Sequence, residues 1–242
     1  ARGEWRLTIA ERKRILLDHI YGVDIDPQAV EVTKLSLLLK VLEGEDEQTI
    51  NQQLALFPER ALPDLGRNIK CGNSLILTDF QDGQQLVLLD DEAALRINVF
   101  DWQAEFPQVF TSRPRKSSVT SEVWDNTESG GFDVIIGNPP YIRIQALKEW
   151  APVEVEYYKR RYRAASKGNY DIYVVFVEKA LELLNEHGRL GYILPHKFFN
   201  AQYGAPLRGL IADGKHLTEV VHFGDQQVFA GATTYTCLLF LE

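Results

Sequence analysis

The sequence predicts an α/β fold with a mostly parallel sheet that closes with an antiparallel hairpin. Two observations predict it. Short apolar runs of strand length alternate along the chain with longer runs of helical periodicity, as in a parallel sheet with helical crossovers. The last two apolar runs, LTEVVHF and YTCLLFL, follow one another without a helix between them. Because 242 residues can form a single large α/β domain, we expect one domain over residues 1–242.

The first half of the chain is expected to supply two strands and their helices. An opening helix leads into a strand over His19–Asp26. Asp26 is the expected N-cap of a helix over Ala29–Leu42, because Pro27 suits a first helical turn. That helix is apolar around much of its surface, so we expect both it and the preceding strand to be buried. A second strand and turn are expected over Asn68–Ile76.

The second half continues the series. FDVIIG, Phe132–Gly137, predicts a third buried strand, and a helix over Tyr170–Gly188 precedes a strand that ends at Pro195. The segment from about 78 to 131 is longer than an ordinary connection and carries ten acidic against four basic residues, so it is interpreted as an insertion. Residues 143–169 are expected to form a flap over whatever follows the third strand.

Composition excludes several classes of protein. No apolar run is long enough to span a bilayer and no signal-peptide pattern is present, so a cytoplasmic location is expected. Cys71 and Cys237 fit no metal-ligand spacing and the histidines form no cluster, which predicts no metal site and requires no disulfide. The chain contains no methionine, which favours a fragment of a longer protein.

The charge is unevenly distributed. The formal net charge is -8, yet residues 142–210 hold eleven Lys and Arg against seven Asp and Glu, an excess of four. Tyrosines interleave with these cations in YKRRYRAASKGNY, which favours a phosphate and base surface over the alternative, a solvated helix face. The cations expected to contact the phosphate backbone of a nucleic acid are Lys159, Arg160, Arg161, Arg163 and Lys167.

Ligands of an open α/β sheet bind beyond the carboxyl ends of its strands, where three groups of polar residues occur. Asp24 lies late in its strand and could accept both hydroxyls of a ribose, whereas Asp26 is explained by helix capping. Asn73, in Gly-Asn-Ser, is also explained by ordinary turn chemistry. Asn-Pro-Pro-Tyr, residues 138–141, is the most specific of the three signals.

The tetrapeptide presents preset hydrogen-bond acceptors. Pro139 and Pro140 fix backbone φ and remove two N–H donors, which leaves carbonyl oxygens without competing amides. The Asn138 side-chain oxygen and the Pro139 carbonyl can accept both hydrogens of a planar amine while the Tyr141 ring stacks on its heterocycle. Such a site suits the N6 amino group of adenine. The alternative is a proline pair that only terminates a strand.

Three further stretches flank the tetrapeptide: GVDIDPQAVEVTKLSL upstream, and YDIYVVFVEKALELL and GRLGYILPHKFF downstream. Together with NPPY they resemble the adenine-N6 DNA methyltransferases of restriction-modification systems, above all the large type II enzymes in which methylase and endonuclease share one chain. The resemblance implies a Rossmann-like core that uses S-adenosylmethionine, with double-stranded DNA as partner. It also implies a recognition domain in the parent chain, and leaves an attached nuclease open.

The resemblance also assigns roles to individual residues. Asp24 would hold the ribose of S-adenosylmethionine, Asn73 would meet the cofactor adenine, and Ser74 would pack nearby. The tetrapeptide Asn138, Pro139, Pro140 and Tyr141 would hold a target adenine flipped out of the duplex. The aromatic residues expected to pack on that base, besides Tyr141, are Phe198, Phe199 and Tyr203, with Tyr203 preferred.

The sequence departs from the family in one respect. The family's first strand and glycine-rich cofactor loop are absent, which predicts a catalytic core truncated at both ends whose isolated form binds the cofactor weakly. Two alternatives remain open. An NPPY methyltransferase could act on a protein glutamine or on RNA, because a carboxamide also offers two hydrogens, and the chain could be a non-catalytic binding module that has lost its loop.

Overall fold

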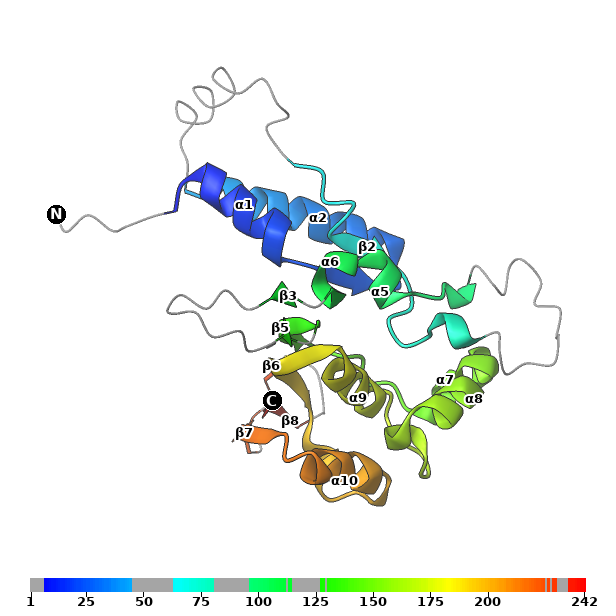
Figure 1. The fold of residues 1–242 in the computed structure, drawn as a ribbon. Helices are drawn as coiled ribbons and strands as arrows, with labels where there is room; N and C mark the ends of the chain where they lie inside the picture. Colours follow the sequence, from blue (N-terminus) through cyan, green and yellow to red (C-terminus); the bar gives the residue numbers. More distant parts are fainter. Residues whose placement is uncertain are drawn as a thin grey trace. The chain divides into compact units, whose positions relative to one another are not determined.

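The computed structural model describes residues 7–44, 63–80, 96–111, 113–114, 127–128, 130–224, 226, 228–229 and 235–242. The chain divides into two compact units, residues 1–106 and residues 107–242 (Figure 1). Each unit carries one part of the expected site, so each is described in turn.

The first unit contains a two-stranded parallel sheet with helices packed on it. Its elements are α1 (Ile9–His19), β1 (Gly22–Asp24), α2 (Pro27–Leu42), β2 (Ile69–Cys71), η1 (Thr78–Phe80) and α5 (Trp102–Glu105). Strands β1 and β2 pair from Gly22 with Ile69 to Asp24 with Cys71. Residues of α1, α2, β2 and the segment before β2 share one apolar core, formed by Ile9, Leu16, Val30, Val41, Leu65 and Ile69.

Helix α2 begins as the sequence predicts. Asp26 accepts a hydrogen bond from the Gln28 N–H at 2.8 Å, and Pro27 occupies the first turn. The prediction of a buried helix holds for one side only, because Val32, Leu35 and Leu39 are 63%, 56% and 58% exposed. Spaced three and four residues apart, they form one face of the helix, while Val30 and Val41 lie in the core.

Part of the expected insertion belongs to the core of the first unit. Val99 forms a parallel bridge with Asn73, and the side chains of Ile97, Phe100 and Phe106 are buried. A side chain at Gly72 would bring its Cβ within 2.4 Å of the Phe100 ring, so the approach of this segment requires glycine. Most of the remaining insertion, with residues 81–95 and 115–126, lies outside the described residues.

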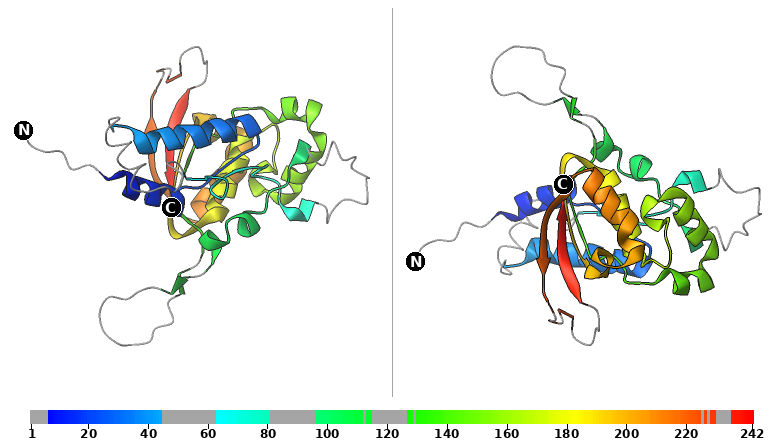
Figure 2. Two further views of the ribbon diagram at one scale, coloured as in Figure 1. Left: turned by 90° about the horizontal axis from the view of Figure 1, so that it is seen from above. Right: turned by 90° about the horizontal axis from the view of Figure 1, so that it is seen from below.

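The second unit is built on a four-stranded mixed sheet in the order β5-β6-β8-β7. Its elements are α6 (Pro107–Phe110), β3 (Arg113–Pro114), β4 (Thr127–Glu128), β5 (Phe132–Gly137), α7 (Ile144–Trp150), α8 (Pro152–Arg161), η2 (Arg163–Ala165), α9 (Tyr173–Leu183), β6 (Leu184–Pro195), η3 (His196–Phe199), η4 (Gln202–Gly204), α10 (Ala205–Asp213), β7 (Leu217–His222) and β8 (Thr236–Leu241). Strands β5 and β6 are parallel, and β8 pairs antiparallel with both β6 and β7. The predicted closing hairpin is therefore present, with β7 and β8 side by side (Figure 2).

Two predictions for this unit are corrected. The helix expected to end at Gly188 ends at Leu183, because Leu184 turns to extended geometry and pairs with Phe132 at the start of the β5–β6 ladder. Strand β5 was expected to be buried, but Val134 and Ile136 on one of its faces are 61% and 80% exposed. The described residues pair β5 on one side only, so β5 is an edge strand.

Candidate active site

The tetrapeptide lies at the carboxyl end of β5. Strand β6 runs parallel to β5, so its end at Pro195 and the following turn η3 share this edge of the sheet. The Asn138 side chain is exposed, and it makes no hydrogen bond to the described residues. Pro139 is buried beside it. The carboxamide of Asn138 is thus available to a ligand at the edge where the sheet is expected to bind one.

The Tyr141 ring is held from two sides. Its hydroxyl donates to the Ile193 carbonyl of β6 at 3.1 Å, and its ring meets the edge of Tyr173 with the centroids 6.4 Å apart at 82°. Burial, together with the nearby Cys237 thiol, raises the pKa of Tyr141 to about 12. The phenol therefore stays neutral at physiological pH, and the ring has a defined orientation.

The aromatic residues after β6 differ in how accessible they are. Phe198 is fully buried and packs between the rings of Tyr173 and Phe199, while Phe199 is half-buried. Tyr203 is also half-buried, and its hydroxyl is hydrogen-bonded to Tyr173 and Asp171. Of the expected base-stacking residues, Tyr203 and Phe199 are partly accessible, whereas Phe198 is buried against Phe199 and Tyr173.

The expected cofactor residues lie in the first unit, at the ends of β1 and β2. The Asp24 carboxylate is exposed and Oδ1 accepts from the Asp26 N–H at 2.8 Å, which leaves its second oxygen without a partner among the described residues. Asn73 is 8% exposed and its side-chain oxygen accepts from the Leu75 N–H at 3.1 Å. The Ser74 carbonyl accepts from the indole N–H of Trp102. The second carboxylate oxygen of Asp24 is thus available to a ligand, while the Asn73 oxygen is engaged in its own turn.

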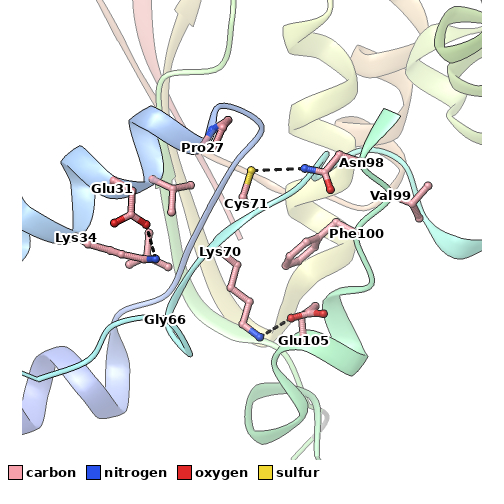
Figure 3. Close-up of a pocket in the computed structure, with 12 residues that line it drawn as sticks. Pro27, Glu31, Lys34, Gly66, Lys70, Cys71, Asn98, Val99, Phe100 and Glu105 are labelled. Carbon is pink, nitrogen blue, oxygen red and sulfur yellow. Dashed lines mark hydrogen bonds and ion pairs between the residues drawn. The ribbon is translucent and has the colours of Figure 1, made fainter. Parts of the chain in front are cut away.

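A pocket of about 470 Å³ lies beside β2 in the first unit. Figure 3 shows that its walls come from α2, β2 and the segment around Phe100, with Lys34 paired to Glu31 and Lys70 paired to Glu105. The expected cofactor residues at the strand ends do not line this pocket. The charged side chains that line this pocket form ion pairs with one another.

The basic segment is folded differently from the prediction. Its tyrosines are buried, so they cannot stack on nucleic acid bases; they are Tyr157, Tyr158, Tyr162 and Tyr170. Three of the five expected backbone contacts are paired with carboxylates: Lys159 with Glu156, Arg161 with Glu182, and Arg163 with Asp213. Arg160 and Lys167 have no carboxylate partner among the described residues. Because exposed ion pairs are weak, a phosphate could still compete for the other three.

Asp171 and Tyr173 belong to the candidate site but are not predicted from the sequence. Asp171 and Tyr173 stand at the start of α9 in YDIYVV, where helical periodicity accounts for the apolar residues but says nothing of the polar ones. The structure brings both to Tyr203, about thirty residues away in the sequence. The only local signal is a pair of polar side chains, two residues apart, at a predicted helix start.

The described residues contain no group of three or more potential metal ligands, and both cysteines are free. No helix in the described part of the chain is long and apolar enough to cross a membrane.

Comparison with known proteins places the chain in a family. The Eco57I restriction-modification methylase family matches residues 18–229. The type II restriction enzyme and methyltransferase RM.Eco57I of Escherichia coli is 36% identical over 98% of this chain. The adenine-specific methyltransferase PglX of Streptomyces coelicolor is 26% identical over 88% of it.

The chain is much shorter than these relatives, of which it spans 20% and 16%. Among solved structures, a type I restriction-modification methyltransferase subunit from Streptococcus thermophilus aligns with 97% of this chain and 43% of its own, at a TM-score of 0.44 and 12% identity. The extent of the family match and the identity to RM.Eco57I show that the chain belongs to the Eco57I restriction-modification methylase family.

Proposed function

We propose that the protein methylates the N6 amino group of a specific adenine in double-stranded DNA. The observation that carries this proposal is the Asn138 carboxamide at the carboxyl end of β5, which makes no hydrogen bond to the described residues and lies beside a Tyr141 ring of fixed orientation. The names of the relatives, which include an adenine-specific methyltransferase, support the same reaction. The bound cofactor, S-adenosylmethionine, would supply the methyl group.

The residues of the tetrapeptide account for the chemistry at the amino group. The Asn138 side-chain oxygen and the Pro139 carbonyl accept its two hydrogens, which draws the nitrogen toward tetrahedral geometry and localises its lone pair. The nitrogen becomes a better nucleophile without losing a proton first. Stacking on the Tyr141 ring offsets the few kcal/mol needed to flip the base out of the helix.

Other parts of the chain support binding of the two substrates. The second carboxylate oxygen of Asp24 would accept from the ribose of the cofactor, and Arg160 and Lys167 would contact DNA phosphates. In the fused relative, restriction enzyme and methyltransferase occupy one chain. We therefore propose that a DNA-recognition domain and a nuclease accompany this core in the full-length protein, with residues 1–242 as one catalytic domain.

The test is a methylation assay of the full-length protein on duplex DNA, with the product nucleoside identified by mass spectrometry. Wild type should form N6-methyladenine, and Asn138→Ala should lower kcat about a hundredfold or more while the protein stays folded. Asn185→Ala is the matched control, because Asn185 bonds Asp133 at the opposite end of the same strands. Equal activity in both variants, or methylation of a glutamine peptide or RNA in place of DNA, would refute the proposal.

A further inference from the structure

A directed chain of hydrogen bonds joins the start of α9 to the loop after β6. The Tyr203 hydroxyl donates to Asp171 Oδ2 at 3.2 Å, and the hydroxyls of Tyr203 and Tyr173 lie 2.9 Å apart. A phenol has one proton to donate, and that of Tyr203 goes to Asp171. Tyr173 must therefore donate to Tyr203, which sets the order Tyr173, Tyr203, Asp171.

The three side chains differ in burial: Tyr173 is fully buried, whereas Tyr203 and Asp171 are half-buried. Burial raises the pKa of both phenols, so both stay protonated. The two hydrogen bonds that join the three side chains restrict the orientation of each of them.

This network touches the candidate active site on two sides. The Tyr173 ring packs edge-on against Tyr141, and its centroid lies 6.2 Å from that of Phe198. The backbone on either side of Asp171 pairs with the chain that follows Tyr141. The Ile144 N–H donates to the Tyr170 carbonyl, and the Ile172 N–H donates to the Ile142 carbonyl, each at 2.9 Å. Residues 170–173 thus contact both the end of the tetrapeptide and the loop that carries Tyr203.

We propose that Asp171 and Tyr173 are positioning residues, which hold the rings of Tyr141 and Tyr203 in the orientation that receives the target adenine. This inference rests on the proposed function of the site. Neither residue needs to touch the base. Their effect is to keep two rings in place during methyl transfer, so their loss should lower turnover more than binding.

Tyr173→Phe in the full-length protein tests the proposal, because it removes one oxygen and keeps the ring. We expect kcat to fall about tenfold while the KM values for DNA and cofactor change less than about twofold. Tyr170→Phe is the matched control, since the Tyr170 hydroxyl is also buried but has no hydrogen-bond partner among the described residues. Its kcat should equal that of wild type, with both variants assayed well below their melting temperatures.

Variants of Asp171 show whether the three side chains act as a unit. Asp171→Asn keeps an acceptor oxygen for Tyr203 and should retain most activity, whereas Asp171→Ala should match Tyr173→Phe. The double variant of Asp171→Ala with Tyr173→Phe should be no worse than either single one, because both break the same network.

Two outcomes would overturn the inference: a Tyr173→Phe enzyme as active as Tyr170→Phe, or additive losses in the double variant. Failure of wild type to methylate adenine would instead overturn the proposed function. In that event amide hydrogen exchange still tests whether the network holds the loop that carries Tyr203. If it does, exchange over residues 196–204 should be faster in Tyr173→Phe and unchanged in Tyr170→Phe.

Discussion

The protein holds the Asn138 and Tyr141 side chains of the tetrapeptide in opposite ways. Asn138 is exposed and makes no hydrogen bond within the described residues, so its oxygen can serve a ligand. Tyr141 is anchored through its hydroxyl to β6 and through its ring to Tyr173. An acceptor must be free to bind, whereas a stacking surface must already be in place.

Removing the ring of Tyr141 should therefore cost more than removing its hydroxyl. Tyr141→Phe loses one hydrogen bond to Ile193, yet the contact with Tyr173 remains, so we expect a loss of activity of less than about tenfold. Tyr141→Ala removes the stacking surface itself and should lose about a hundredfold or more. Turnover on one duplex that contains the target site would measure both, and equal losses would show that the hydroxyl is the essential group.

At the scale of elements, two neighbouring carboxylates at the β1–α2 junction have separate tasks. Asp26 caps α2 through the Gln28 N–H, and Asp24 accepts from the Asp26 N–H with one oxygen. The other oxygen of Asp24 is the one available to a ribose. The cap contributes to the stability of a helix, while we propose that Asp24 contributes to a binding site.

Alanine substitutions should separate these two tasks. Asp26→Ala should lower the free energy of unfolding by about 1 kcal/mol, because an N–H at the start of α2 loses its acceptor, with little change in cofactor affinity. Asp24→Ala should abolish detectable binding of S-adenosylmethionine. Urea unfolding and isothermal titration of both variants provide the test, and a larger loss of affinity in Asp26→Ala would reverse the assignment.

For the whole molecule, buried acids set how stability depends on alkaline pH. Burial raises the pKa of Cys237 from 9.0 to about 11 and that of Tyr141 from 10.0 to about 12. Burial raises the pKa values of other tyrosines in the same unit as well, namely Tyr162, Tyr170, Tyr173 and Tyr192. These groups ionise more readily in the unfolded chain, so their contribution is complete below the unfolded pKa and is lost as pH rises.

We therefore expect the free energy of unfolding to be constant with respect to these groups below about pH 9 and to fall progressively above it. Urea unfolding at a series of alkaline pH values measures this fall. In Cys237→Ala, the part of this fall that begins at the lowest pH should be absent. The free energy of unfolding should then begin to fall near the ordinary tyrosine pKa of about 10. A free energy of unfolding that does not change up to about pH 11 would contradict the prediction.

Each unit also has a strand edge without a partner in the described residues. Strand β1 pairs only with β2, and β5 pairs only with β6. Unpaired N–H and C=O groups at a sheet edge favour association. We expect these edges to favour self-association of residues 1–242.

Sedimentation of this chain over a range of concentrations tests that expectation. A monomer at every concentration would contradict it.

The sequence by itself determined the features that depend on near neighbours. The tetrapeptide is recognisable because two prolines constrain their own backbone, and the start of α2 because Asp26 and Pro27 act within one turn. The order of the main strands and the closing hairpin also followed from local periodicity, whereas helix α10 was not predicted.

Only the tertiary structure decided which distant residues meet. Burial turned the tyrosines of the basic segment inward, and pairing with β5 ended α9 at Leu183. Residues 97–106, expected to belong to an insertion, complete a core, and Tyr173 and Asp171 reach Tyr203 across about thirty residues. Periodicity records that a face is apolar, but the partner that covers it depends on how the whole chain packs.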